Sequence, residues 1–391
     1  MKRILLLLTL FLVGILIVWF VGNTNQSTDN NQPAAETGNL PVADEGFSRA
    51  LDVQPLIFPQ DHGPHPDFQT EWWYYTGNLQ AEDGHRFGYQ LTFFRRALQP
   101  VEALQDRPSN WRTSQVYMAH FALSDIDNQD YQAFERLSRS AAGLSGARAT
   151  PFKVWLQDWS VEETGSNERG FSTYELYAAQ DDIELRLTLD DLKGPILQGE
   201  QGFSRKGPEA GQASYYYSFT RLDTTGSVAI GDKRFSVQGY SWMDHEFSTS
   251  VLSQDQVGWD WFSIQMEDGS ELMVFQIRKA DGSIDPFSSG TFVSEDGTTT
   301  PLSQKDFNIV IKESWQSPHT KAQYPASWEI EIPKLDLKIN VEPHMPDQEL
   351  NLSYSYWEGA VKVLGQRAGN PIIGNGYVEL TGYSGSMGGE F

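Results

Sequence analysis

The segment 242–247 has the sequence Trp-Met-Asp-His-Glu-Phe, which places three ionisable residues in a row between large apolar ones. Burying such groups costs free energy unless they are paired or used. If the segment is a β-strand, its side chains alternate between two faces. One face then carries Tyr240, Trp242, Asp244 and Glu246, and the other carries Met243, His245 and Phe247. An aspartic acid among aromatic rings is typical of a proton donor, because desolvation keeps it protonated near neutral pH.

A second aromatic segment, Gly-Trp-Asp-Trp-Phe at 258–262, has a similar character. On a strand, Trp259 and Trp261 face one way and Asp260 faces the other. Aromatic walls with one or two carboxyl groups suit an apolar ligand, because the walls bury its surface and the polar groups orient it. We therefore expect Trp259 and Trp261 to line a ligand pocket together with Asp244.

The segment 65–77 is the third candidate for a site. Alternation puts Glu71, Trp73 and Tyr75 on one face and Trp72 and Tyr74 on the other. Because both faces are aromatic, we expect this strand to be covered on both sides. A buried Glu71 needs a partner. Two interpretations remain open: a structural ion pair with Arg95 or Arg96, or a polar floor for a ligand pocket that Trp73 and Tyr75 help to line.

Other chemistries find less support in the sequence. Asp244, His245 and Glu246 are metal-ligand types, but neighbours on a strand point to opposite faces and cannot converge on one ion without a bulge. We expect neither a metal nor a cofactor. The serines between 248 and 253 lack the Gly-x-Ser-x-Gly elbow of a serine hydrolase. His120 is interpreted as a hydrogen-bonded core histidine rather than a base.

The N-terminus predicts export. Lys2 and Arg3 precede an apolar run over 4–21, so residues 1–22 form either a signal peptide or a membrane anchor, a hydrophobic helix in both cases. Residues 23–50 have the polar composition of a linker. We expect a periplasmic, secreted or membrane-anchored protein. The formal net charge of −23 argues against nucleic-acid binding, and the absence of cysteine excludes disulfides and thiol chemistry.

The remainder predicts an all-β protein. Aromatic or β-branched runs alternate with Asp-Gly turns at 83–84, 268–269, 281–282 and 296–297, a strong hairpin signal. Helical periodicity is absent, apart from a turn of helix expected over 189–197 or near Ser138. Strands at regular spacing without helices favour antiparallel barrels or sandwiches. A boundary near Thr224-Thr225-Gly226 divides the chain into domains over 51–224 and 225–391.

Several of these motifs together resemble the family of AttH and the carotenoid 1,2-hydratases, labelled predicted secreted hydrolases. The motifs are 65–79, 216–221, 242–247, 258–262 and 376–383, and the resemblance extends over about residues 50–388. It implies two tandem lipocalin-like β-domains and a hydrophobic small molecule or lipid as partner, with an ABC transporter as a membrane partner. In the hydratases an aspartate two positions after an aromatic residue protonates an alkene, which here implies Asp244 and Trp242. The hydratases have a tyrosine where this chain has Trp242.

Three hypotheses follow for the function. In the first, Asp244 gives a proton to an alkene or a leaving group, Trp242, Trp259 and Tyr217 stabilise the cation, and His245 supports Asp244 from behind. Water then completes hydration or hydrolysis of an extended, lipid-like or isoprenoid-like molecule. In the second, the protein is a non-catalytic periplasmic carrier of such a molecule, with Asp244 paired to an arginine or a histidine. In the third, the aromatic strands are only core and Glu71 and Asp244 fix the fold.

Overall fold

The computed structural model describes residues 46–103, 113–249 and 252–386. This part of the chain is built almost wholly from antiparallel strands, with three short 3₁₀ turns, η1 (Gln60–His62), η2 (Val101–Ala103) and η3 (Pro333–Leu335). Two sheets divide the strands between them, one following the other along the chain. The predicted all-β fold with two lipocalin-like sheets in tandem is confirmed.

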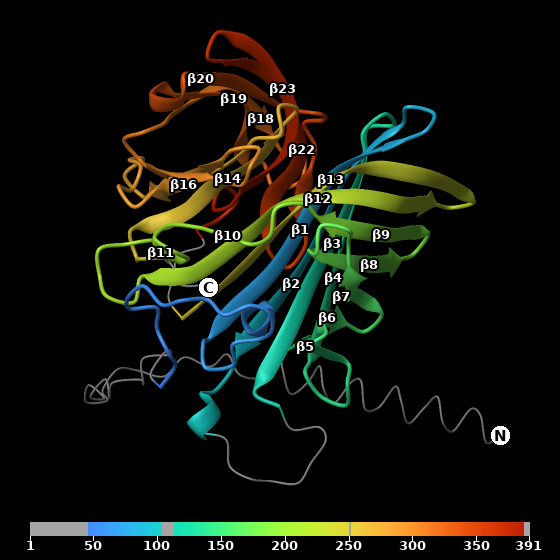
Figure 1. Cartoon of the computed structure of the whole chain (residues 1–391), viewed down its shortest axis with the longest axis vertical. Helices are drawn as coiled ribbons and strands as arrows, with labels where there is room; N and C mark the ends of the chain where they lie inside the picture. The colour runs from blue at the N-terminus through green and yellow to red at the C-terminus, as the bar shows by residue number, and fades with distance from the viewer. Residues whose placement is uncertain (1–45, 104–112, 250–251, 387–391) are drawn as a thin grey trace, which may run out of the picture. The chain divides into compact units, whose positions relative to one another are not determined.

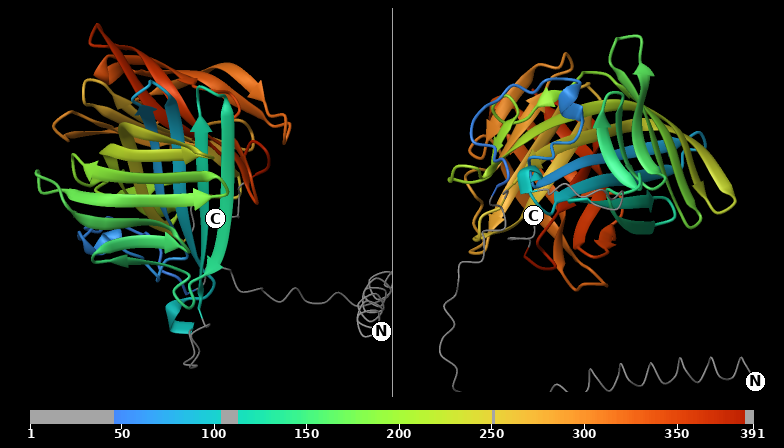
Figure 2. Two further views of the ribbon diagram at one scale, coloured as in Figure 1. Left: turned by 90° about the vertical axis from the view of Figure 1, so that its right-hand side faces the viewer. Right: turned by 90° about the horizontal axis from the view of Figure 1, so that it is seen from below.

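The first sheet has 13 strands and curls around one large core (Figures 1 and 2). Its main path runs β4-β3-β2-β1-β13-β12-β9-β8-β7-β6-β5, and β10 and β11 pair with β12. The strands are β1 (Thr70–Ala81), β2 (Arg86–Ala97), β3 (Gln115–Asp125), β4 (Asp130–Arg139), β5 (Ser145–Ala149), β6 (Phe152–Leu156), β7 (Trp159–Ser166), β8 (Ser172–Gln180), β9 (Ile183–Asp191), β10 (Ile196–Leu197), β11 (Phe203–Arg205), β12 (Ala213–Ile230) and β13 (Lys233–Ser248).

The second sheet has 10 strands and a core of its own. Its path runs β17-β16-β15-β14-β23-β22-β20-β19-β18, and β21 pairs with β22. The strands are β14 (Gln256–Met266), β15 (Glu271–Lys279), β16 (Ser289–Val293), β17 (Thr299–Ser303), β18 (Asn308–Gln316), β19 (Gln323–Ile332), β20 (Leu337–Pro343), β21 (Glu349–Asn351), β22 (Ser355–Arg367) and β23 (Asn370–Leu380). The predicted turns at 83–84, 268–269 and 296–297 join β1 to β2, β14 to β15 and β16 to β17.

The two sheets pack against each other through their central strands. β1 and β2 contact β23 and β22, and β12 contacts β14 (Figure 1). The approach is close at Gly88 of β2, where a Cβ would lie 2.6 Å from the Cβ of Ala360 on β22. Strand β1 is therefore covered on both faces, as expected from its sequence, by the core of its own sheet and by the second sheet.

The division between the sheets differs from the boundary expected at residue 224. That residue lies within β12, and the chain passes from the first sheet to the second between Ser248 and Gln256. Gly226, which was expected at the domain boundary, is a strand residue with φ of +153°, and a Cβ there would lie 2.2 Å from the backbone oxygen of Arg186 on β9. A glycine that permits close packing of two strands was mistaken for a break between domains.

The two predicted helical turns are wrong. Ser138 lies in β4, and the segment 189–197 comprises the end of β9, a turn and β10. The Asp191 carboxylate accepts hydrogen bonds from the backbone N–H groups of Lys193 and Gly194, which stabilises a turn in place of a helix. Within the three described ranges, no helix is long and apolar enough to cross a membrane. The hydrophobic segment 1–22 and most of the predicted linker lie outside those ranges.

Candidate functional site

A cavity of about 90 Å³ lies between the two sheets. Both sheets contribute to its wall, which is mostly aromatic and aliphatic. The lining residues are Trp72, Tyr74, Phe94, Met118, His120, Lys206, Tyr216, Asp244, Glu246, Leu252, Trp259, Trp261, Phe275, Ile277, Tyr354, Tyr356, Glu379 and Thr381. A concave apolar site with a few polar groups is the usual form of a small-molecule site.

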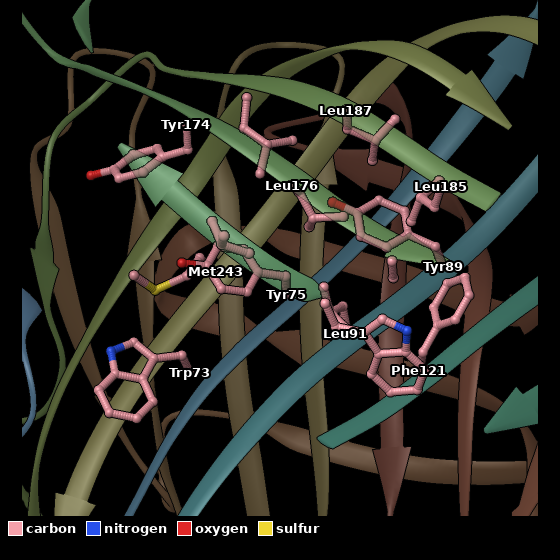
Figure 3. Close-up of a cluster of buried hydrophobic side chains, with 14 of the residues drawn as sticks. Trp73, Tyr75, Tyr89, Leu91, Phe121, Tyr174, Leu176, Leu185, Leu187 and Met243 are labelled. Atoms are coloured by element: carbon pink, nitrogen blue, oxygen red, sulfur yellow. The ribbon is translucent and has the colours of Figure 1, made fainter. Parts of the chain in front are cut away.

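Strand pairing brings Asp244 into the wall of this cavity. On β13, Asp244 is paired with Tyr74 of β1 on one side and with Ser218 of β12 on the other. Alternation therefore places Trp72, Tyr74 and Tyr216 on the cavity side together with Asp244, because paired residues share a face. Met243 points the opposite way, into the core of the first sheet (Figure 3).

Three neutral donors hold the Asp244 carboxyl group. Ser218 Oγ and Trp242 Nε1 donate to Oδ1 at 2.5 and 2.7 Å, and the Tyr216 hydroxyl donates to Oδ2 at 2.6 Å. The carboxyl group is buried, and burial raises its pKa to about 7, although the three hydrogen bonds lower it. A substantial fraction of Asp244 is therefore a neutral acid at neutral pH.

Glu246 lies one position further along this face and is paired. Lys206 Nζ lies 3.2 Å from its Oε1, and the Ser214 hydroxyl donates to the same oxygen. The Lys206 ammonium group also lies over the ring of Phe275, 4.1 Å from its centroid. The charge of Glu246 is thus compensated within the wall, whereas the partners of Asp244 among the described residues are neutral.

The second sheet contributes a further carboxyl group, Glu379 on β23. Its strand partners are Trp261 of β14 on one side and Glu358 of β22 on the other. Trp259 Nε1 donates to Glu379 Oε2 at 2.6 Å. Burial raises the pKa of Glu379 to about 7 against this hydrogen bond, and the charges of Asp244 and Glu246 raise it further.

Glu358 lies behind the cavity wall. It is fully buried, and the Tyr74 hydroxyl donates to its Oε1. Burial and the neighbouring Glu379 raise the pKa of Glu358 well above its usual value. Its surroundings therefore favour the neutral form of Glu358, and the hydrogen bond holds Tyr74 in place.

Comparison with known protein families assigns this chain to one of them. The profile of the AttH-like family matches residues 49–383. The chain belongs to the AttH-like family. The resemblance inferred from the motifs is thereby confirmed.

Two solved structures illustrate how this AttH-like chain relates to others. A protein described as an AttH from Nitrosomonas europaea is 36% identical, with a TM-score of 0.75, over 86% of this chain and 99% of the other. Kievitone hydratase from Nectria haematococca is 14% identical, with a TM-score of 0.62, over 87% of this chain and 98% of the other. The second likeness concerns the fold alone. A search among curated proteins gave no match.

Of the residues predicted for the site, Asp244, Glu246, Trp259 and Trp261 line the cavity. Trp242 holds Asp244 from behind and meets Trp261 edge to face, with ring centroids 6.3 Å apart. These five residues, drawn from β13 and β14, form one group although they come from different sheets.

The other predicted residues lie elsewhere. Trp73 and Tyr75 point into the core of the first sheet, as Figure 3 shows. Tyr217 is buried in the same core and makes hydrogen bonds with His62 and His245. Tyr240 is 43% exposed and is not among the residues of the cavity wall. These expectations are corrected: the tyrosine beside Asp244 is Tyr216.

Glu71 and His245 belong to a buried cluster on the other face of β1 and β13. Arg95 Nε donates to Glu71 Oε2 at 2.6 Å. Of the two interpretations of Glu71, the structure therefore fits the ion pair, with Arg95 as the partner. His65 Nδ1 and His245 Nε2 lie 2.7 and 2.8 Å from Glu71 Oε1. Burial opposes ionisation of Glu71, but Arg95 and His65 hold its pKa well below the usual range. The cluster joins β1, β2 and β13.

Among the described residues, His65, Glu71 and His245 are the group with metal-ligand spacing, since their ligand atoms lie within 4.8 Å of one another. His245 and Asp244 point to opposite faces, so the consecutive trio 244–246 cannot bind one ion. Arg95 opposes a dication at the observed cluster, because its guanidinium group bonds to the same carboxylate. The geometry fits an ion-paired network better than a metal centre.

His120 lines the cavity, contrary to its interpretation as a core histidine alone. Its Nδ1 lies 2.7 Å from the Tyr356 hydroxyl, and its Nε2 lies 3.1 Å from Glu135 Oε2. The hydrogen-bonded state was foreseen, but the position was not. Glu379 was not predicted as a site residue. It is the one acid of the segment 376–383, and that signal could have identified it.

Proposed function

We propose that this protein is an enzyme that protonates a carbon–carbon double bond of an extended apolar molecule and adds water to it. Asp244 is the acid in this proposal. The observation that carries the proposal is the environment of Asp244. Its carboxyl group is buried in an aromatic cavity, accepts hydrogen bonds from the neutral donors Tyr216, Ser218 and Trp242, and has a pKa raised to about 7. A carrier in which Asp244 is neutralised by arginine is not favoured by those partners.

The reaction begins with transfer of the Asp244 proton to one alkene carbon, which leaves a carbocation on the other. The rings of Tyr216, Trp259 and Trp261 line the cavity around this cation and stabilise it through their faces. A water molecule attacks the cation and loses a proton, so that the product is an alcohol. The fold supports such chemistry in another protein, since kievitone hydratase shares it.

The apolar wall favours an isoprenoid-like substrate, because it provides surface burial with few groups that select polar substituents. The predicted N-terminal export segment would place the reaction outside the cytoplasm. The proposal includes a supply of the substrate from a membrane by an ABC transporter.

The test uses the full-length protein with farnesol, geranylgeraniol and squalene as probe alkenes in D₂O. Wild-type protein should yield products that have gained one D₂O, detected by mass spectrometry. Asp244→Asn should lower the hydration rate by about 10² to 10⁴, the usual contribution of a general acid. Binding of the apolar dye N-phenyl-1-naphthylamine should stay within about threefold, because the side chains are nearly isosteric.

The matched control is Asp191→Asn, since Asp191 is another buried aspartate with a raised pKa, about 6, and does not line the cavity. This variant should hydrate the probes at the wild-type rate. Undiminished turnover by the Asp244 variant would refute the proposal. Dye binding with no turnover of any probe by wild-type protein would count for the carrier.

A further inference from the structure

Two carboxyl groups from different sheets line the same cavity in similar surroundings. Asp244 comes from β13 and accepts a hydrogen bond from the indole N–H of Trp242 at 2.7 Å. Glu379 comes from β23 and accepts one from the indole N–H of Trp259 at 2.6 Å. Both residues line the same wall. Within the described parts of the chain, each of the two acids is held by neutral donors and neither forms an ion pair.

The two groups are also linked through the wall. Tyr216 donates to Asp244 and accepts a hydrogen bond from Trp261 Nε1 at 3.2 Å. Trp261 in turn is the strand partner of Glu379. The charge of Asp244 disfavours ionisation of Glu379, so the pair gives up its first proton more readily than its second. Around neutral pH a singly ionised pair is therefore well populated.

The other acids near the cavity are already occupied. Glu246 is paired with Lys206 at 3.2 Å. Glu358 is fully buried behind the wall and bonded by Tyr74. Glu379 differs from both. Unlike Glu358, it is partly accessible and lines the cavity, and unlike Glu246, it is held by a neutral donor, the indole N–H of Trp259.

We infer that Glu379 is the second catalytic carboxyl group, the base that removes a proton from the attacking water while Asp244 acts as the acid. This inference rests on the function proposed above and names the partner of Asp244. Asp244 loses its proton to an alkene carbon, and the carbon–oxygen bond forms as water loses a proton to the Glu379 carboxylate. The product is an alcohol, and transfer of one proton from Glu379 to Asp244 restores the starting state.

The test separates the two steps with isotopes. Full-length protein is incubated with farnesol in D₂O enriched in ¹⁸O, and both the alcohol product and the recovered alkene are analysed. Protonation alone places deuterium in the recovered alkene when the cation loses a proton again. Hydration also places ¹⁸O in the product. The first label reports on Asp244 and the second reports on Glu379.

For Glu379→Gln we expect ¹⁸O incorporation to fall by about 10² or more, as for loss of a general base, with deuterium exchange into the alkene retained. Asp244→Asn should lose both labels. The matched control is Glu349→Gln, at a buried glutamate of β21 that is bonded by Ser317, Thr320 and Tyr324 and does not line the cavity, and it should keep the wild-type ratio of the labels. Full ¹⁸O incorporation by the Glu379 variant would overturn the inference and leave the role of Asp244 intact.

A second measurement does not depend on turnover. With ¹³C-labelled carboxyl groups, NMR titration of the full-length protein should show Glu379 titrating near neutral pH. Its midpoint should fall in Asp244→Asn, because the neighbouring negative charge has been removed. A midpoint for Glu379 in the ordinary range of glutamate, about 4, would overturn the inference whether or not farnesol is a substrate.

Discussion

The protonation of Asp244 depends on two hydroxyl groups whose own orientation is fixed. Trp261 Nε1 donates to the Tyr216 hydroxyl at 3.2 Å, and Gln198 Nε2 donates to Ser218 Oγ at 2.9 Å. With a lone pair occupied in this way, each hydroxyl directs its hydrogen to Asp244. These donors oppose the effect of burial, and the balance leaves the pKa about 7 rather than far higher.

Replacing Tyr216 by Phe should therefore raise the pKa of Asp244 above about 7. The hydrogen bond stabilises the carboxylate, so its loss favours the neutral acid and shifts the titration to higher pH. The measurement is the ¹³C NMR titration of Asp244. Tyr217→Phe is the control, because that hydroxyl bonds to His62 and His245 on the opposite face. An unchanged midpoint in Tyr216→Phe would show that this hydroxyl does not set the acidity.

Alternation along the chain predicted which residues share a face, and at this level the sequence was sufficient for Asp244, Trp242 and Glu246. It could not show which neighbours they meet. Tyr216 and Tyr217 are adjacent and alike, and only the register, in which Ser218 pairs with Asp244, assigns Tyr216 to the cavity. For the same reason the wrong face of β1 was expected to line the pocket: Trp72 and Tyr74 line it, whereas Trp73 and Tyr75 lie in the core.

At the scale of elements, a buried charge cluster holds β1, β2 and β13 together at one end. Glu71, Arg95 and His245 each come from one of these strands, and the guanidinium Nη2 of Arg95 also donates to the backbone oxygens of His65 and Phe68 at 2.8 Å. Since Arg95 is 1% exposed and Glu71 is fully buried, removing Arg95 takes away the charge that contributes most to stabilising the buried Glu71 carboxylate.

Arg95→Met should therefore lower the free energy of unfolding by about 3 to 5 kcal/mol, measured by urea denaturation. The control pair is Arg86 and Asp127, bonded at 2.6 Å but 45% and 35% exposed. Arg86→Met should cost at most about 1 kcal/mol, because solvent screens that pair. Equal effects of the two substitutions would contradict a special role for the buried cluster.

Most strands could be predicted because Asp-Gly turns and alternating aromatic residues mark them. Near Ser138 in β4 a turn of helix was expected instead, because β4 lies at the end of the strand order and its residues are mostly half-buried on both faces, so its sequence lacks clear alternation. The expected boundary at residue 224 falls inside the first sheet, because β12 and β13 are 18 and 16 residues long and continue this sheet to Ser248.

At the scale of the whole molecule, as described over 46–103, 113–249 and 252–386, the cavity exists only because two sheets approach closely. Asp244 and its hydroxyl donors come from the first sheet, and Trp259, Trp261 and Glu379 come from the second. A sequence can indicate two β-domains, but the faces that meet are fixed by side-chain volumes at contacts between residues far apart in the chain. Gly88 and Ala360 are such a contact, and neither has a type or spacing that would mark it.

Gly88→Val should separate β2 from β22, because a Cβ at Gly88 would lie 2.6 Å from that of Ala360. We expect the free energy of unfolding to fall by about 1 to 3 kcal/mol, the usual cost of overpacking. Binding of N-phenyl-1-naphthylamine should weaken about tenfold, since water enters a cavity that needs both sheets. The measurements are urea denaturation and dye fluorescence of the full-length protein.

Two further variants decide whether this effect comes from the contact between the sheets. Gly165→Val on β7 is the control, because a Cβ there meets nothing within 4 Å, and it should leave dye binding unchanged. Adding Ala360→Gly to Gly88→Val removes the opposing Cβ and should restore part of the dye affinity. Equal losses in both valine variants, or no recovery in the double variant, would mean that the cavity does not depend on this approach of the two sheets.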